Sequence, residues 1–165
     1  LYPICTMGAH VSEANPNISI TTKACVAMCG TFGYELDATK LSKKEIAECR
    51  RQSRLFKKYR PIIFEGDYYR LTNPFHPGNL SAWQSVSKDK KESLISVVVT
   101  NLTVNGPQEY ILAKGLNPDW FYYVDQLDME ISGSALMHIG LPIPREIPEY
   151  TSFQYHLKHK RKSNK

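Results

Sequence analysis

The residues best placed to do chemistry lie near the N-terminus, in the segment "MGAHVS". His10 follows an apolar stretch and precedes polar residues, as expected at the carboxyl end of a buried parallel strand. Catalytic and binding groups of α/β barrels lie at this end of a strand. A histidine that only hydrogen-bonds backbone is the commoner case, because most single histidines are not catalytic.

Two pairs of acids have a spacing that could support acid and base catalysis. Glu35 and Asp37 alternate in "GYELD", and Glu65 and Asp67 alternate in "FEGDYYRL", so each pair would share one face of a strand. We expect both pairs to serve turns and local ion pairs with Lys or Arg instead. No nucleophile-elbow, P-loop or dinucleotide motif accompanies them.

The cysteines offer a second kind of site. Cys25 and Cys29 are four residues apart on a predicted helix, so with Cys49 and His10 they could hold zinc. Structural zinc sites usually have tighter C-x2-C or H-x3-H pairs, and a free cysteine is one of the most buried residue types. We therefore predict buried thiols, no metal site and no cofactor.

An aromatic segment, "DWFYYV", is a candidate sugar platform. On a strand, Trp120 and Tyr122 would point to one side, and Phe121 and Tyr123 to the other. No cluster of Asp, Asn or Arg accompanies them to bind sugar hydroxyls. We therefore expect aromatic side chains on one face to fill a core and those on the second face to pack on a neighbouring domain.

The net charge of +5 comes from the C-terminal tail, which contains Lys158, Lys160, Arg161, Lys162 and Lys165 and no acid. We interpret this tail as a frayed, solvated terminus. The rest of the chain has no basic stripe with interleaved aromatic residues, so nucleic-acid binding is not expected. No apolar run approaches the length of a membrane span.

Residues 1–64 have an α/β pattern. The segment "YPICTMGAHV" predicts one buried strand, and "TTKACVAMCG" predicts a compact helix with Gly30 as a left-handed C-cap. Ser42 and Glu45 form a capping box at the start of a second helix. Pro61 should end that helix, because the residue before a proline is disfavoured in the helical region.

From residue 65 onward the sequence predicts an antiparallel β-sandwich. About seven short segments are rich in β-branched and aromatic residues and are separated by turn clusters such as "NPFHPGN" and "SKDKK". The predicted strands are "DYYRL", "SAWQSV", "SLISVVVTNLTV", "QEYILA", "WFYYV", "LDMEI" and "SFQYHL".

Blocks along the whole chain resemble the closing part of the family 36 α-galactosidases. They are "YPICTMGAHVS", "VAMCGTFGYELDATKLSKKE", "YRPIIFEGDYYRLTNPF", "AWQSVSKDK", "AKGLNPDWFYYV" and "ISGSALMHIGLPIP". The resemblance implies the last strand and helices of a (β/α)8 TIM barrel in residues 1–64, followed by a C-terminal β-sandwich domain in residues 65–165.

The resemblance also implies retaining hydrolysis of terminal α-linked galactose in sugars such as melibiose and raffinose. One aspartate would act as nucleophile and another as acid/base. Both belong to motifs that precede "YP", so we expect no catalytic residue in this chain. His10 would be a substrate-binding residue at the rim of the site or just behind it.

The chain begins with Leu1 and lacks the pattern of a secretory signal, so we expect a cytoplasmic chain cut from a longer protein. Galactose-containing oligosaccharides are the expected partners, without nucleic acid or membrane, and a homo-oligomeric parent is left open. An α-N-acetylgalactosaminidase, a galactosyl-transferring relative and a non-catalytic carbohydrate-binding β domain are the alternatives. Alone, residues 1–64 should be marginally stable, because one strand and two helices cannot bury both sheet faces.

Overall fold

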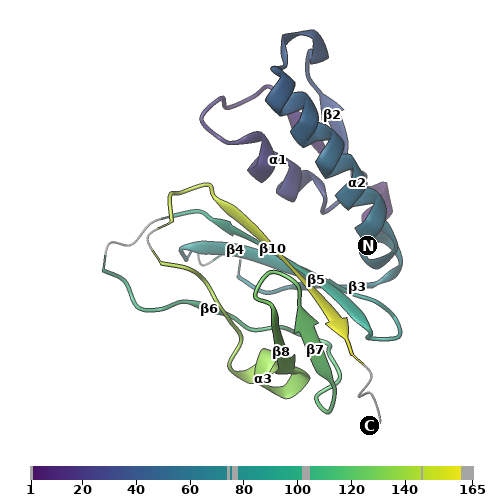
Figure 1. Ribbon diagram of the computed structural model, residues 1–165, viewed down its shortest axis with the longest axis vertical. Helices are drawn as coiled ribbons and strands as arrows, with labels where there is room; N and C mark the ends of the chain where they lie inside the picture. The colour runs from purple at the N-terminus through teal and green to yellow at the C-terminus, as the bar shows by residue number, and fades with distance from the viewer. Residues whose placement is uncertain (1, 74, 76–77, 102–104, 146, 161–165) are drawn as a thin grey trace.

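The computed structural model describes residues 2–73, 75, 78–101, 105–145 and 147–160. Figure 1 shows a small unit of helices and short strands beside a larger antiparallel sheet. Among the described helices, none combines the length and apolar character that a membrane span requires.

The first unit begins with two parallel strands, β1 (His10–Ser12) and β2 (Gly33–Glu35), joined through helix α1 (Ile20–Ala27). The prediction of a single strand through "YPICTMGAHV" was wrong. That segment contributes only His10 and Val11 to β1 and contains the 3-10 helix η1 (Ile4–Thr6). Because His10 is the first residue of β1, its predicted place at the carboxyl end of a strand was also wrong. The turn forms because the amide and hydroxyl of Thr6 both donate to the Pro3 carbonyl, at 3.0 and 2.8 Å.

Helix α1 ends differently from the prediction. Its C-cap is Met28 in the right-handed region, and the left-handed Gly30 cap was wrong. Gly30 is needed for a close approach instead, because a Cβ there would lie 2.4 Å from the Met7 carbonyl oxygen. The glycine therefore lets the chain leaving α1 pass against the segment that leads into β1.

Helix α2 (Lys43–Glu65) confirms the predicted capping box, with Ser42 and Glu45 bonded reciprocally. The prediction that Pro61 ends this helix was wrong. The helix continues because Ile62 and Ile63 are buried against the larger sheet, so tertiary packing outweighs the loss of one backbone hydrogen bond.

The larger sheet has six strands in the order β3-β4-β5-β10-β7-β8, and every neighbouring pair is antiparallel. Its long central strands are β4 (Leu80–Val86), β5 (Glu92–Val99) and β10 (Ser152–His159). The outer strands are β3 (Asp67–Arg70), β7 (Phe121–Val124) and β8 (Met129–Ser132). All seven predicted segments contribute to strands, and the antiparallel prediction is confirmed.

A second layer covers one face of this sheet. It contains the two-stranded pair β6 (Tyr110–Ile111) and β9 (Leu141–Pro142) and helix α3 (Gly133–His138). Strand β9 and helix α3 were missed from the sequence. Strand β9 has two residues and α3 has six, which is too short for a recognisable hydrophobic periodicity. The main core lies between the layers and is sandwich-like, with Ile95, Leu136, Leu141, Tyr122 and Leu157 among its fully buried side chains.

Helices α1 and α2 lie against the opposite face of the sheet (Figure 1). His156 of β10 is fully buried at this junction, and its ring packs edge-on against Tyr59 of α2 at 4.9 Å. Its Nδ1 lies 3.1 Å from Asp125 and its Nε2 lies 2.9 Å from Glu92. The ring contact with Tyr59 therefore joins α2 to the sheet, whereas the polar partners of the buried imidazole come from the sheet side.

The predicted frayed tail is only partly as expected. Lys158 lies within β10 and donates to Asp125, and Lys160 pairs with Glu130 at 3.1 Å. Both residues make these contacts with the sheet, so the prediction of a frayed, solvated terminus was wrong for them. Arg161, Lys162 and Lys165 lie outside the described residues.

Candidate functional site

The face of β1 and β2 that points away from the helices carries polar side chains. His10 and Ser12 flank Val11, which is fully buried in the small core beside α1. The parallel register places His10 opposite Gly33, and Ser12 opposite Glu35. Because side chains alternate along a strand, His10, Ser12 and Glu35 share the open face.

His10 and Glu35 form a loose polar pair on this face. His10 Nδ1 lies 3.8 Å from Glu35 Oε2, and half of the His10 side chain is exposed. The ring lies across Gly33, where a Cβ would be 3.0 Å from His10 Cδ2. The Nε2 atom has no hydrogen-bond partner among the described residues.

The predicted carboxylate pairs do not form catalytic pairs. Asp37 lies beyond the end of β2 and caps the 3-10 helix η2 (Ala38–Lys40). Hydrogen bonds from the hydroxyl and amide of Thr39, followed by the Lys40 contact, lower the pKa of Asp37. Glu65 ends α2, whereas Asp67 begins β3 and pairs with Lys88. Asp37 and Asp67 thus serve a turn and an ion pair, as predicted.

A polar network behind β2 holds the strands to the helices. The Tyr34 hydroxyl lies 2.9 Å from Gln52 Oε1 and 3.0 Å from the Cys49 carbonyl. Gln52 in turn donates to Glu48 at 2.8 Å, and Arg51 donates two hydrogen bonds to the same carboxylate. The Arg51 hydrogen bond is the largest cause that lowers the pKa of Glu48 to about 2, whereas burial raises the pKa of Tyr34 to about 12.

This network was missed from the sequence. Only the Glu48–Arg51 spacing of three residues, which suits a pair on one helix face, signalled part of it. The buried Gln52 reads as a polar residue of an exposed helix face, because its partners on α1 and β2 lie far away in the sequence.

The cysteines do not converge on a metal site. The prediction of buried thiols is confirmed for Cys25 and wrong for the others, since Cys29 and Cys49 are half-buried and Cys5 is exposed. Cys25 lies between α1 and β10, with its sulfur 4.0 Å from the Phe153 carbonyl oxygen. Burial raises its pKa to about 12. Within the described residues, no group of three or more His, Cys, Asp or Glu side chains is arranged to hold a metal ion.

The aromatic segment of β7 does not form an open platform. Tyr122 is fully buried in the main core, and its hydroxyl donates to the Lys90 carbonyl at 2.9 Å. Trp120 packs partly on the same core and stacks on His159 at 4.2 Å. Tyr122 therefore fills the core and Trp120 packs against it, and neither forms a sugar platform.

Two family models together cover most of the chain. Residues 1–66 match the model described as "Melibiase", and residues 80–157 match the "Glycosyl hydrolase family 36 C-terminal domain". The chain belongs to glycosyl hydrolase family 36. The family 36 resemblance inferred from the sequence blocks is thereby confirmed.

Curated family 36 relatives align with nearly all of the chain. It is 42% identical over 160 residues to the bifunctional alpha-galactosidase/sucrose kinase AgaSK of Mediterraneibacter gnavus, covering 93% of this chain and 17% of the relative. It is 38% identical over 164 residues to alpha-galactosidase AgaA of Geobacillus stearothermophilus, covering 96% of this chain and 22% of the relative. The chain thus spans about a fifth of the length of these relatives.

Solved structures of family 36 share the fold. The galactosidase domain of AgaSK matches with a TM-score of 0.91 and 40% identity over 96% of this chain and 23% of that chain. The alpha-galactosidase from Lactobacillus brevis matches with a TM-score of 0.92 and 29% identity over 99% of this chain and 24% of that chain. The helical unit and the antiparallel sheet therefore occur together in this family.

One part of the predicted fold needs correction. The chain was expected to hold only the last strand of a barrel, whereas its first unit contains two parallel strands and the helices that follow each of them. The second strand, in "FGYEL", is too short to stand out as a separate element, and its parallel pairing with β1 is non-local.

Proposed function

We propose that this chain is the C-terminal part of a retaining α-galactosidase that hydrolyses terminal α-linked galactose from oligosaccharides such as melibiose and raffinose. The observation that carries the proposal is the match of one continuous body, parallel β/α unit and antiparallel sheet together, to the galactosidase domain of AgaSK at 40% identity. A structure of AgaA in complex with raffinose, matched at 37% identity, supports the substrate class.

The chemistry of this proposal requires groups from outside the chain. A retaining glycosidase needs two carboxyl groups roughly 5 Å apart, one to attack the sugar and one to protonate the leaving oxygen. The acids singled out from the sequence are committed elsewhere or, like Glu35, lie exposed beside a histidine. We infer that both catalytic aspartates belong to the preceding part of the barrel.

His10 has the position of a substrate-binding residue in this proposal. It lies on the open face of a parallel β/α unit, and in barrels that face is turned to the interior. Glu35 can hold the imidazole in place while Nε2 meets a sugar hydroxyl. His10 would bind and orient sugar at the rim, and it would take no part in bond cleavage.

The proposal is tested by comparing the full-length polypeptide with residues 1–165 alone. Hydrolysis of p-nitrophenyl α-galactoside and raffinose is expected only from the full-length polypeptide, and proton NMR should show α-galactose as the first product. A full-length polypeptide that cleaves neither sugar, or that first releases β-galactose, contradicts the proposal. Activity in residues 1–165 would show that the catalytic acids lie within this chain.

The role of His10 is tested by His10→Ala in the active polypeptide. We expect KM for raffinose to rise about tenfold with a much smaller change in kcat, because a binding contact is lost. His138→Ala is the matched control, since His138 is exposed on α3 and hydrogen-bonds only its own helix. Equal KM values for His10→Ala and the control would remove His10 from the site.

A further inference from the structure

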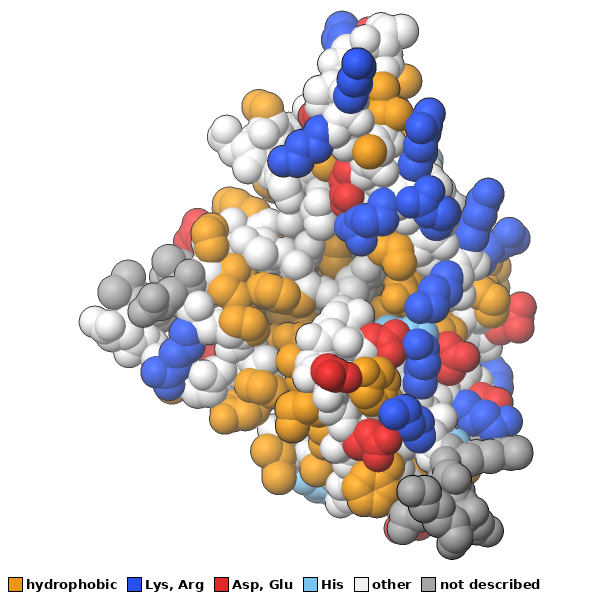
Figure 2. Space-filling model, viewed as in Figure 1, with side chains coloured by type: hydrophobic (Ala, Val, Ile, Leu, Met, Phe, Trp, Pro, Cys, Tyr) orange, Lys and Arg blue, Asp and Glu red, His pale blue; other side chains and the backbone are white. Residues whose placement is uncertain are grey.

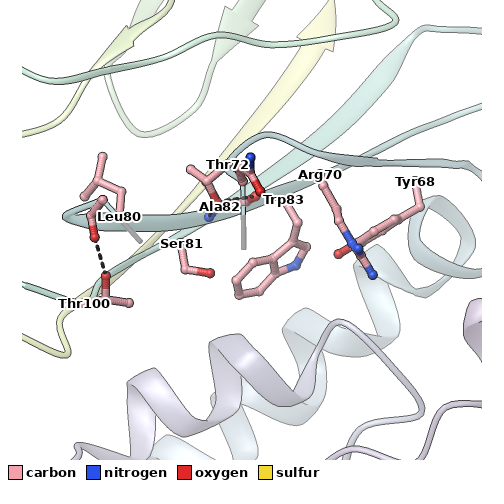
Figure 3. A pocket seen from close by; sticks show the side chains of 10 residues that line it. Tyr68, Arg70, Thr72, Leu80, Ser81, Ala82, Trp83 and Thr100 are labelled. Atoms are coloured by element: carbon pink, nitrogen blue, oxygen red, sulfur yellow. Dashed lines mark hydrogen bonds between the residues drawn. The ribbon is translucent and has the colours of Figure 1, made fainter. Parts of the chain in front are cut away.

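A pocket of about 350 Å³ opens on the side of the larger sheet that faces the helices. Its lining includes Tyr68, Arg70, Thr72, Ser81, Trp83 and Thr100, and we call it the Trp83 pocket. Figure 3 shows the side chains of Tyr68, Arg70 and Trp83 on one side of strands β3 and β4, pointing toward the helices. This volume is within the range of small-molecule binding sites.

The strand register builds the centre of the pocket. Arg70 of β3 lies directly opposite Trp83 of β4, and Ser81 projects from the same face of β4 two residues earlier. The guanidinium of Arg70 lies beside the Tyr68 hydroxyl (Figure 3). An indole ring, a guanidinium and two hydroxyls are therefore held together by two neighbouring strands.

Several donors in the pocket are not used by the protein itself. Within the described part of the chain, no carboxylate pairs with Arg70, and neither the Trp83 indole nor the Ser81 hydroxyl has a hydrogen-bond partner. By contrast, the Thr72 hydroxyl accepts from the Ala82 amide at 2.9 Å, and the Thr100 hydroxyl donates to the Gly78 carbonyl at 3.3 Å. The unused groups are concentrated at the centre, around Trp83.

The chemistry of the lining selects the kind of ligand. Among the described residues, the lining contains one cation, Arg70, and no acid, and its other polar groups are neutral hydroxyls and an amide. An aromatic ring offers a flat apolar surface, and a guanidinium fork donates two parallel hydrogen bonds to neighbouring acceptors. A sugar ring has both complements, an apolar face of C–H groups and adjacent hydroxyls.

We propose that the Trp83 pocket binds one neutral sugar residue of an oligosaccharide, which stacks on Trp83 and accepts hydrogen bonds from Arg70. A single cation among neutral groups makes a neutral ligand a better fit than a phosphate, for which several positive charges are usual. The pocket lies apart from the His10 face, because helices α1 and α2 separate β1 and β2 from the sheet.

The test is equilibrium binding of raffinose to the full-length polypeptide in the presence of saturating 1-deoxygalactonojirimycin, followed by calorimetry and saturation-transfer NMR. A structure of AgaA contains this compound, so it serves to occupy the proposed hydrolytic site. We expect residual raffinose binding that weakens at least about tenfold in Trp83→Ala and in Arg70→Gln. Arg70 is exposed, so Arg70→Gln tests the pocket even if Trp83→Ala folds poorly.

Trp120→Ala is the matched control, because it removes the chain's other tryptophan at a position outside the pocket. It should leave the residual binding unchanged. The proposal is overturned if no raffinose binds with the inhibitor present, if Trp120→Ala weakens binding as much as Trp83→Ala, or if inorganic phosphate competes with raffinose. Since binding is measured without turnover, loss of hydrolysis alone would count against the proposed enzyme and not against this pocket.

Discussion

The two halves of the molecule close their hydrophobic cores in different ways. In the helical unit, two three-residue strands pack one face on α1 and α2, and the core consists of Val11, Ala24, Ala27 and Met28. In the β-rich half, fourteen buried hydrophobic residues among those described lie between the six-stranded sheet and its covering layer. Figure 2 shows hydrophobic side chains gathered at the surface over the β-rich half, whereas Lys and Arg side chains are prominent over the helical unit.

The two halves differ in how far their hydrophobic surfaces are covered within this chain. The β-rich half buries both sides of its core within the chain, whereas the helical unit leaves the His10 face of its strands open. A parallel sheet normally has both faces covered. We therefore expect the helical unit to be the less stable half and to rely on the sheet for its order.

The largest expected effect concerns Cys25, which lies at the contact between the halves. Its pKa rises from 9.0 to about 12, so at pH 8 its thiolate fraction is about 1,000-fold below that of a free thiol. Iodoacetamide should label the exposed Cys5 quickly and Cys25 at least that much more slowly, as measured by mass spectrometry.

Mild urea sharpens this experiment. If the helical unit separates first, Cys25 should become reactive while amides of β5 and β10 are still protected from exchange. Labelling of Cys25 at the rate of Cys5 in the absence of urea would show that the two halves are not docked in solution.

A matched pair of core truncations comes next in size. Leu157→Ala, in the main core, should lower the free energy of global unfolding by about 3 kcal/mol, because it leaves a cavity in a closed core. Val11→Ala should cost about 2 kcal/mol, confined to the helical unit. Hydrogen exchange separates the two cases, since only Leu157→Ala should speed exchange throughout the sheet. Equal effects on every amide would mean that the two halves unfold as one unit.

The smallest of these effects is a pH dependence set by Glu48 within the helical unit. Its pKa is about 2 in the folded chain and near 4.5 when unfolded, so its stabilising contribution is present above about pH 4.5 and is lost as the pH falls toward 2. Glu48→Gln should cost roughly 2 kcal/mol at pH 7 and flatten stability between pH 5 and 2. Urea unfolding of both proteins at several pH values, followed by helical circular dichroism, measures this. An unchanged slope in the variant would show that folding does not lower the pKa of Glu48.

Local signals were sufficient for much of the fold. The capping box at Ser42 and Glu45 involves residues three apart, and the strands of the main sheet carry runs of β-branched and aromatic residues, so both were predicted from sequence. Pro61 was misread because the burial of Ile62 and Ile63 depends on a sheet that comes later in the chain. The pairing of β1 with β2 was missed for a related reason, since it joins two very short segments across a helix.

The candidate site was only partly predictable. The order of apolar and polar residues around His10 predicted the carboxyl end of a strand, which was wrong, because His10 is the first residue of β1. Its side chain nevertheless lies on an open face. Its neighbour Glu35 comes from β2, so no spacing rule links the two residues. The Trp83 pocket was not foreseen, because Arg70 and Trp83 become neighbours only through the pairing of β3 with β4.

The junction at Gly66 has a mechanical consequence. One residue separates the end of α2 from the start of β3, and a Cβ there would lie 2.2 Å from the Ile62 carbonyl oxygen and 2.5 Å from that of Val86. Because this connection is short and tightly packed, we expect a rotation of the sheet to turn α2 with it. Helix α2 is about 35 Å long. The N-terminus of α2 follows β2 and η2 in the chain and lies on the side of the carboxyl ends of both parallel strands. A rotation of the sheet would therefore be transmitted along α2 to the carboxyl ends of β1 and β2.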